Sequence, residues 1–279
     1  MSRVPTSPAT SLASPSNPRI KAAVRLRDRR TREELGLTLV DGAREVRRAL
    51  DAGVEVVEAF LYEPALAGED ARAALDRLRA TGIPLHSTTE PAFAKVAFGA
   101  RVDGLVAVVR PPALDLAALR LPPDPLVVVV EGAEKPGNVG AILRSADGAG
   151  ADAVIAASPR TDLWNPNVIR ASAGTAFSVG LAAGPSSLVL GWLRERAVRI
   201  VAARVDGALP YSEADLIGPL AIVLGSEAGG LTRTWVGADV TAVRLPMHGV
   251  ADSLNVSVTA AVLLYEARRQ RDRHGLPAD

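Results

Sequence analysis

Three segments of this 279-residue chain share one design, in which an apolar strand runs into a loop that holds glycine and a few polar residues. In chain order they are LVVVVEGAEKPGNVGAILR (126–144), GPLAIVLGSEAGGLT (218–232) and VTAVRLPMHGVADSLNVSV (240–258). A continuous apolar run such as Leu126–Val130 is typical of a strand that is buried on both faces of a parallel sheet. Because loops that follow parallel strands gather at one edge of the sheet, we expect the three loops to meet in an α/β domain.

The first loop lies between a strand and a helix, expected from about Asn138 to Ala149, and this unit indicates ligand binding near a helix N-terminus. It fits neither common nucleotide-binding fingerprint. A Walker A loop needs lysine where Asn138 follows Gly137, and a dinucleotide-binding loop needs glycines closer together than Gly137 and Gly140. Arg144 lies four residues after Gly140 on the same helix face, and is either a ligand contact or an ordinary surface ion pair.

The other two loops carry a carboxylate and a group of small polar residues. Glu227 lies between Gly225 and Gly230, and such glycines allow a ligand to approach the backbone closely. The third loop leads into the last helix with more polar residues than helix capping requires. Asp252 or Ser253 is the expected N-cap of that helix. Capping therefore explains one or two of these side chains, and the others remain candidates for a binding site.

The first half of the chain predicts a separate, small α/β domain. Strand-like and helix-like segments alternate through it, and several of the helices end at glycine. A proline-rich segment, PPALDLAALRLPPDP, marks the boundary with the second half. We therefore expect a disordered leader rich in Ser, Thr and Pro at 1–17, a binding domain at 18–110, a semi-rigid linker at 111–125, a second domain at 126–272 and a tail at 273–279.

The start of the binding domain is strongly basic. Seven of the residues from Arg19 to Glu33 are Lys or Arg, and the apolar residues among them give a partial helical stripe. The sequence thus predicts a basic helix from Arg19 to Arg32. Its charge is either a solvated helix face or a surface that contacts the phosphates of a nucleic acid.

The composition excludes several classes of function. The chain has no cysteine, which excludes disulfides, thiolate metal sites and cysteine nucleophiles. Its three histidines lie far apart without a metal-binding spacing, so we expect no metal. The net charge is only +1, so a nucleic-acid contact must come from a local patch. No apolar run approaches the roughly 18 residues of a membrane span, and the N-terminus lacks the apolar centre of a secretory signal. A cytoplasmic protein is therefore expected.

Three stretches of the second half resemble, in order and spacing, the signature motifs of the SpoU/TrmH family of RNA ribose 2′-O-methyltransferases, within the SPOUT superfamily. They are PGNVGAILRSADGAGADAVI, LVLGSEAGGLT and LPM followed by SLNVSVTAAVLLYE, and the match covers nearly all of 126–271. The first half resembles the family's appended RNA-binding domain, which is similar to kink-turn-binding ribosomal proteins. Its opening, NPRIKAAVRLRDRRTREELGLTLVDGAREV, is similar to members that act on large-subunit ribosomal RNA.

The resemblance implies a C-terminal domain with a deep trefoil knot that binds S-adenosylmethionine and methylates a ribose 2′-hydroxyl of RNA, foremost 23S ribosomal RNA, as a homodimer. Motif matching gives the cofactor contacts as Gly225, Leu245, Leu254 and Ile200, and the catalytic positions as Asn138, Arg144, Glu227, Ser253 and Asn255. The similar segment VIRASAGTAF assigns Arg170 to RNA or cofactor, and the basic helix adds Arg25, Arg29 and Arg30 as RNA contacts. Many relatives have aspartate where this chain has Lys135, which adds positive charge near the RNA.

Several alternatives remain open at this point. Arg144 is either the general base or a clamp for phosphate and hydroxyl, because a guanidinium is almost always protonated and then cannot accept a proton. The substrate is alternatively transfer RNA, or the ribosomal site of thiostrepton- and nosiheptide-resistance methyltransferases, which share the two-domain layout. Other chemistries are a Rossmann-type nucleotide enzyme and a knotted base methylator. The non-enzyme alternative is an RNA-binding protein without catalysis.

Overall fold

The structure of the protein is a computed structural model that describes residues 11–98, 103–227 and 229–274. The chain divides into two compact units. The first comprises Met1–Pro112 with Leu163–Ser178, and the second comprises Ala113–Asp162 with Val179–Asp279. No helix in the described ranges combines the length and the apolar character that a membrane crossing requires.

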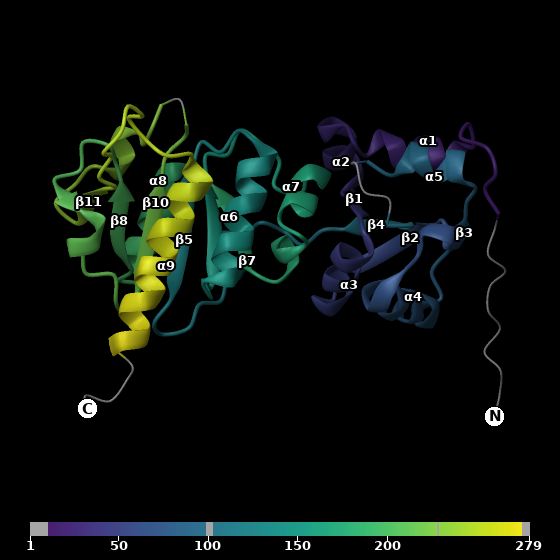
Figure 1. The fold of residues 1–279 in the computed structure, drawn as a ribbon, viewed down its shortest axis with the longest axis horizontal. Helices are drawn as coiled ribbons and strands as arrows, with labels where there is room; N and C mark the ends of the chain where they lie inside the picture. Colours follow the sequence, from purple (N-terminus) through teal and green to yellow (C-terminus); the bar gives the residue numbers. More distant parts are fainter. Residues whose placement is uncertain (1–10, 99–102, 228, 275–279) are drawn as a thin grey trace. The chain divides into compact units, whose positions relative to one another are not determined.

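The first unit is built on a four-stranded sheet with the order β1-β4-β2-β3. Strand β4 runs antiparallel to both β1 and β2, whereas β2 and β3 are parallel. Figure 1 shows α1 and α5 on one face of this sheet and α3 and α4 on the other. The alternation of strands and helices expected from the sequence is therefore confirmed. The elements are α1 Pro18–Arg25, α2 Arg29–Leu35, β1 Thr38–Asp41, α3 Ala43–Asp51, β2 Glu55–Leu61, η1 Glu63–Ala65, α4 Gly68–Thr81, β3 Leu85–Ser87, α5 Glu90–Val96 and β4 Leu105–Arg110.

The basic segment forms two helices, so the expected single helix from Arg19 to Arg32 is wrong. Helix α1 ends at Arg25, and Asp28 begins α2 because its side chain accepts a hydrogen bond from the backbone N–H of Thr31 at 2.9 Å. The guanidinium of Arg32 is buried and donates to the carbonyl oxygens of Leu26 and Arg27 at 2.9 and 2.8 Å. One of the seven basic residues therefore stabilises the turn between the helices instead of facing solvent.

The expected leader is ordered at its C-terminal end. Leu12 is 4% exposed and packs in the core of the first unit, and its backbone N–H donates to the carbonyl of Ser87 at 2.8 Å. The hydroxyl of Thr89 donates to the carbonyl of Ala13 at 2.8 Å. These contacts contradict a disordered segment that reaches residue 17, while residues 1–10 of the expected leader lie outside the described residues.

A segment from the second half of the sequence belongs to the first unit. It contains α7 (Pro166–Ala171) and η3 (Thr175–Phe177). The hydroxyl of Thr38 donates to the carbonyl of Trp164 at 2.6 Å, and the indole N–H of Trp164 donates to the carbonyl of Pro112 at 3.0 Å. Arg170 forms an ion pair of 2.9 Å with Asp41 at the end of β1. The expected second domain at 126–272 is therefore interrupted, because Leu163–Ser178 belongs to the first unit.

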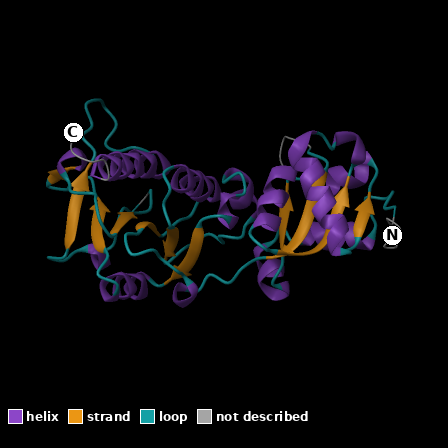
Figure 2. Ribbon diagram, turned by 90° about the horizontal axis from the view of Figure 1, so that it is seen from below, coloured by secondary structure: helices purple, strands orange, loops and turns teal. Residues whose placement is uncertain are grey.

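The second unit contains a seven-stranded sheet with the order β7-β6-β5-β10-β8-β11-β9, and every pair is parallel. Helices α6 and α9 pack against each other on one face, and α8 lies on the other; Figure 2 shows helices on both faces. The elements are η2 Leu116–Ala118, β5 Leu126–Glu131, α6 Pro136–Gly148, β6 Ala153–Ala157, β7 Gly180–Gly184, α8 Ser186–Glu195, β8 Arg199–Ala203, β9 Leu209–Pro210, η4 Tyr211–Glu213, β10 Leu220–Leu224, η5 Arg233–Trp235, β11 Val240–Arg244 and α9 Val256–His274.

The central strands of this sheet are its most buried part. All residues of β5 and β10 are buried, as the continuous apolar runs predict for strands covered on both faces. Each buried Val, Leu or Ile side chain contributes about 1.5–3 kcal/mol relative to an exposed one. The strand ends that carry the three loops are thereby fixed to a rigid core, so the loops are presented from defined positions.

Candidate active site

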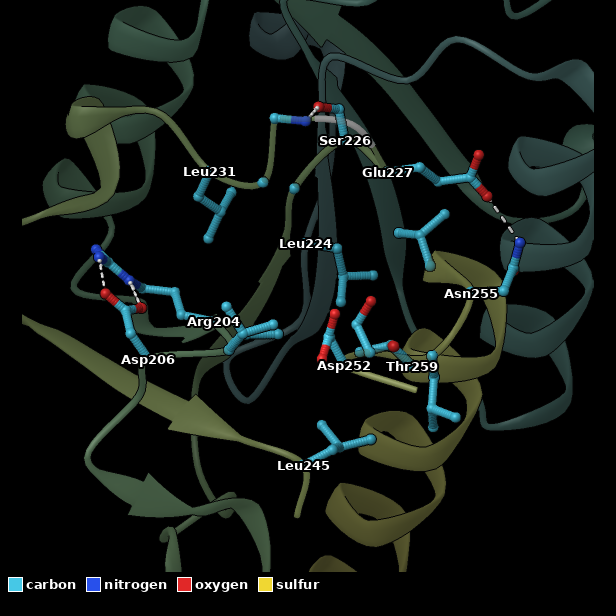
Figure 3. A pocket seen from close by; sticks show the side chains of 18 of the residues that line it. Arg204, Asp206, Leu224, Ser226, Glu227, Leu231, Leu245, Asp252, Asn255 and Thr259 are labelled. Carbon is cyan, nitrogen blue, oxygen red and sulfur yellow. Dashed lines mark hydrogen bonds and ion pairs between the residues drawn. The ribbon is translucent and has the colours of Figure 1, made fainter. Parts of the chain in front are cut away.

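The three loops predicted to meet do so, around a cavity of about 870 Å³ at the carboxyl edge of the parallel sheet (Figure 3). This volume is within the range of small-molecule sites. The lining comes from the loops after β5, β8, β10 and β11 and from the start of α9. Its described residues are Lys135, Ala203–Asp206, Leu224–Glu227, Gly229–Leu231, Leu245, Met247, Asp252–Val256 and Thr259.

The loop after β10 folds back on itself at a position that only glycine tolerates. A Cβ atom on Gly225 would lie 2.2 Å from the backbone carbon of Gly230. Ser226 and Gly230 exchange two backbone hydrogen bonds of 3.1 and 3.0 Å, and Gly230 has a φ of +62°. Glycine is therefore required for the tight turn that brings Glu227 to the rim of the cavity.

Glu227 joins the three motifs through its two carboxylate oxygens. Oε1 accepts hydrogen bonds from the side-chain amides of Asn138 at 2.6 Å and Asn255 at 2.8 Å, and Oε2 accepts from the ammonium of Lys135. The amide of Asn255 also lies 3.3 Å from Oδ1 of Asn138. The hydrogen bond from Lys135 is the main cause that lowers the pKa of Glu227, and the Asn138 amide adds to it against the opposing effect of burial. Glu227 is thus held as a carboxylate that fixes both amides.

Asn255 has a second role, as the N-cap of α9. Its Oδ1 accepts from the backbone N–H of Ser257 at 2.9 Å and from the Ser257 hydroxyl at 2.6 Å, and α9 begins at Val256. The expected cap at Asp252 or Ser253 is therefore wrong, because the helix starts later than those positions allow. Since Oδ1 faces the helix backbone, Nδ2 is left to face Glu227.

Most of the predicted site residues lie together. Gly225, Leu245, Leu254 and Ser253 line the cavity. Ile200 does not: it is 3% exposed and packs in the core within β8. Its assignment to the cofactor remains a prediction.

Arg144 is exposed on α6 and lies outside the cavity lining. Within the described part of the chain it forms neither an ion pair nor a hydrogen bond, so the alternative of an ordinary surface ion pair is not observed. Its guanidinium is therefore available to a ligand that approaches from outside the cavity.

Three sets of contacts near the site are not predicted by the sequence. The ammonium of Lys135 contacts Glu227, and Arg204 and Asp206 form an ion pair at the rim. Glu131, only 3% exposed, accepts from the hydroxyl of Ser186 at 2.6 Å and from Thr232 through its N–H at 2.7 Å and its hydroxyl at 2.9 Å. Glu131 could have been singled out in the sequence, because it is a carboxylate at the end of an otherwise apolar strand. It fixes the end of the glycine loop.

The arginines predicted to bind RNA lie in the first unit. Arg25 is exposed at the end of α1, while Arg29 and Arg30 form ion pairs of 2.7 and 2.6 Å with Glu33 and Glu34 one helical turn later. Such exposed pairs are weak and can exchange for phosphate.

Arg170 is in a different environment, because its side chain is 20% exposed and pairs with a fully buried carboxylate of Asp41. Burial raises the pKa of Asp41 to about 6, although the Phe98 N–H and Arg170 both oppose this effect. Arg170 therefore has a structural partner in the first unit, and its assignment to RNA or cofactor stays a prediction.

Among the described residues, no group of three or more His, Cys, Asp or Glu side chains is placed to hold a metal ion.

The sequence and the fold are similar to those of known RNA methyltransferases. The SpoU rRNA Methylase family matches residues 125–265, and the MRM3-like substrate binding domain matches residues 17–107. The 23S rRNA (guanosine-2'-O-)-methyltransferase RlmB of Vibrio vulnificus (strain CMCP6) is 32% identical over 241 residues, which cover 82% of this chain and 96% of that protein.

Two solved structures superpose on nearly the whole chain. One, described as an RNA 2'-O ribose methyltransferase, has a TM-score of 0.83 and 42% sequence identity, and covers 94% of this chain and 99% of its own. The SpoU methyltransferase AviRb from Streptomyces viridochromogenes, in complex with the cofactor AdoMet, has a TM-score of 0.83 and 29% identity, and covers 94% of this chain and 100% of its own. The three motifs, the matched region and these relatives agree, and the chain belongs to the SpoU rRNA Methylase family.

Proposed function

We propose that this protein transfers a methyl group from S-adenosylmethionine to a ribose 2′-hydroxyl of 23S ribosomal RNA. The observation that carries the proposal is the cluster of Glu227, Asn138 and Asn255 at the rim of the cavity, where all three motifs of the family meet. The relative from Vibrio vulnificus is named for this activity on 23S ribosomal RNA, and the AviRb structure holds AdoMet.

The residues that line the cavity fit S-adenosylmethionine. Leu231, Leu245 and Leu254 supply apolar walls suited to an adenine ring, and Gly225 brings backbone close to the cavity. We assign Gly225, Leu245 and Leu254 to the cofactor directly, and Ile200 to support of the wall from within β8. When bound, the cofactor supplies a methyl group on a sulfonium, which is already a good leaving group.

The chain's own groups orient the ribose and the phosphate. The amides of Asn138 and Asn255, both fixed by Glu227, present polar groups at the rim, and Ser253, two residues before Asn255, also lines the cavity. We assign Arg144 to clamping a phosphate next to the reacting ribose, because its guanidinium is exposed and without a protein partner in the described chain. A protonated guanidinium holds phosphate well and accepts no proton. Alignment of the hydroxyl with the methyl group supplies most of the acceleration.

The first unit supplies the contact to RNA. We assign Arg25, Arg29 and Arg30 to phosphate binding, since all three are exposed on α1 and α2. The four-stranded sheet with helices on both faces supports a likeness to kink-turn-binding ribosomal proteins. Arg170, paired with Asp41, is proposed to reach RNA only at the exposed part of its side chain.

The second unit has features that support a trefoil knot. The segment after β11 and the loop after β10 line one cavity, and the chain then continues into α9, which packs against α6. We propose that the C-terminal segment is threaded through this loop. Such knots are rare exceptions among protein folds.

A homodimer completes the proposal. Val258 and Tyr265, spaced by seven residues on α9, are 47% and 54% exposed, and Leu254 just before the helix is 39% exposed. Apolar side chains repeated along one helix face are typical of a helix that packs against a partner. We propose that α9 pairs with a second copy, and that the enzyme works in the cytoplasm, where ribosomal RNA is found.

A deletion strain tests the proposal. Ribose methylation of its 23S ribosomal RNA is mapped nucleotide by nucleotide and compared with the parent strain. We expect one 2′-O-methylated nucleotide to be lost and to return with the wild-type gene but not with the Arg144→Ala variant. An unchanged methylation map would overturn the proposed substrate.

A further inference from the structure

The described lining of the cavity carries five charged side chains, and four of them form two ion pairs. Arg204 donates to both carboxylate oxygens of Asp206 at 2.9 Å each, and the ammonium of Lys135 contacts Glu227. The fifth is Asp252, for which no hydrogen bond or ion pair occurs within the described residues. Two cations and three carboxylates give this lining a net charge of −1, and the uncompensated charge is on Asp252.

The position of Asp252 means that a ligand in the cavity would come close to its carboxylate. The residue is exposed, and it lies on the loop between β11 and α9 whose leucines, Leu245 and Leu254, also line the cavity. Figure 3 shows Asp252 among the side chains that surround the space. A ligand that fills the cavity removes water from the carboxylate, which is unfavourable unless the ligand brings a positive charge.

We propose that Asp252 makes the site prefer the sulfonium form of the cofactor over its thioether product. At neutral pH, S-adenosylmethionine carries a sulfonium, an ammonium and a carboxylate, whereas S-adenosylhomocysteine has lost the sulfonium charge. Methyl transfer forms the O–CH₃ bond and breaks the S–CH₃ bond, whose electron pair stays on sulfur as a neutral thioether, and the hydroxyl proton passes to water. The reaction itself thereby removes the charge that complements Asp252, and the product is released more readily. This inference rests on the proposed function.

A preference that comes from charge weakens as salt is added, whereas a preference that comes from the shape of the cavity does not. Because Asp252 is exposed, its attraction for a cation weakens as salt screens it, with a Debye length of about 8 Å at physiological ionic strength. The ratio of the two dissociation constants, product over cofactor, should therefore fall as salt is added to the wild-type protein. The same ratio in a variant without this carboxylate should depend little on salt.

Calorimetric titration of the full chain tests the inference with three ligands: S-adenosylmethionine, S-adenosylhomocysteine and sinefungin, in which a charged amine replaces the methyl sulfonium. Asp252→Asn removes the charge at nearly constant size. Asp252→Glu keeps the charge. Glu134→Gln is the matched control, because it removes a carboxylate from the loop after β5 that pairs with Arg160 and does not line the large cavity.

We expect Asp252→Asn to raise the dissociation constants of S-adenosylmethionine and sinefungin about three- to tenfold, and to change that of S-adenosylhomocysteine less than about twofold. Asp252→Glu and Glu134→Gln should keep the wild-type ratio of dissociation constants. If Asp252→Asn raises all three dissociation constants equally, or raises none of them, the inference is overturned. If wild-type protein binds none of the three, the proposed function itself fails.

Discussion

Nδ2 of Asn255 lies 2.8 Å from Oε1 of Glu227 and donates a hydrogen bond to it, so the start of the last helix and the glycine loop after β10 are joined through two side chains. The other face of the same amide caps the helix through Ser257. One residue thus fixes the position of α9 and the orientation of a carboxylate at the rim of the cavity.

Substitution of Asn255 separates these two roles. Serine is as good an N-cap as asparagine, so Asn255→Ser should keep the cap and lose only the bond to Glu227, which lowers the free energy of unfolding by up to about 3 kcal/mol. Serine is too short to reach Glu227, and methyl transfer should fall about 10- to 100-fold, the scale of one lost hydrogen bond to a charged group. Asn255→Ala should lose the same activity and a further ~1 kcal/mol of stability. Normal turnover by Asn255→Ser would show that the bond to Glu227 is not needed.

The contact between Lys135 and Glu227 should set the acid limit of activity. The hydrogen bond from Lys135 is the largest cause that lowers the pKa of Glu227, so this carboxylate persists below the ordinary value of about 4.3 and is lost only as the pH falls further. Lys135→Met removes that cause, and the acid limb of the pH–rate profile should move to higher pH. Lys135→Arg should leave the limb near its wild-type position. The pH–rate profiles are recorded at saturating cofactor. If the acid limbs of Lys135→Met and the wild-type protein coincide, the prediction is contradicted.

The role of Arg144 as a clamp predicts a loss confined to RNA. Arg144→Ala should abolish methyl transfer while the dissociation constant for S-adenosylmethionine changes less than about threefold, since this side chain lies outside the cavity lining. Arg144→Lys keeps the charge but not the paired donors, and should retain partial activity with a raised KM for RNA. A lysine that acted as a general base would instead give a new rise in kcat toward alkaline pH. That rise would refute the clamp.

Much of the site follows from patterns that are local in the sequence. The apolar runs at Leu126–Val130 and Leu220–Leu224 predict strands buried on both faces, and the structure confirms both. Parallel strands force their loops to one edge, which is why Gly225, Glu227 and Asn255 could be expected together before any contact was known.

Other features depend on contacts between residues far apart in the chain. The ammonium of Lys135 meets Glu227 across 92 positions of sequence, and Thr232 meets Glu131 across 101. The sequence does not show which residue caps α9, because Asp252, Ser253 and Asn255 are all good N-caps and only the packed loop decides between them. The inclusion of Leu163–Ser178 in the first unit likewise depends on tertiary contacts such as that between Arg170 and Asp41.

Asp41 should make stability depend on pH. Burial raises its pKa from 3.8 to about 6 in the folded protein, so the folded state binds more protons than the unfolded state between these values. The free energy of unfolding therefore falls as the pH rises through this window, by up to about 3 kcal/mol at about 1.36 kcal/mol per unit.

The comparison with Asp41→Asn isolates this group, because other titrations cancel in the difference. The unfolding free energy of the wild type minus that of Asp41→Asn should decrease between about pH 4 and about pH 7, measured by urea denaturation. A difference that stays constant, or that increases with pH, would mean that the Arg170 ion pair outweighs burial at Asp41.

The position of the methyl group on the product distinguishes transfer to a ribose hydroxyl from transfer to a base. Purified protein is incubated with labelled S-adenosylmethionine and 23S ribosomal RNA from a strain that lacks the gene, and the RNA is digested to nucleosides for mass spectrometry. We expect the label in one 2′-O-methylated nucleoside, with the added mass on the sugar fragment, and no label with Arg144→Ala. Label on the base fragment, or no label with wild-type protein that binds the cofactor, would contradict it.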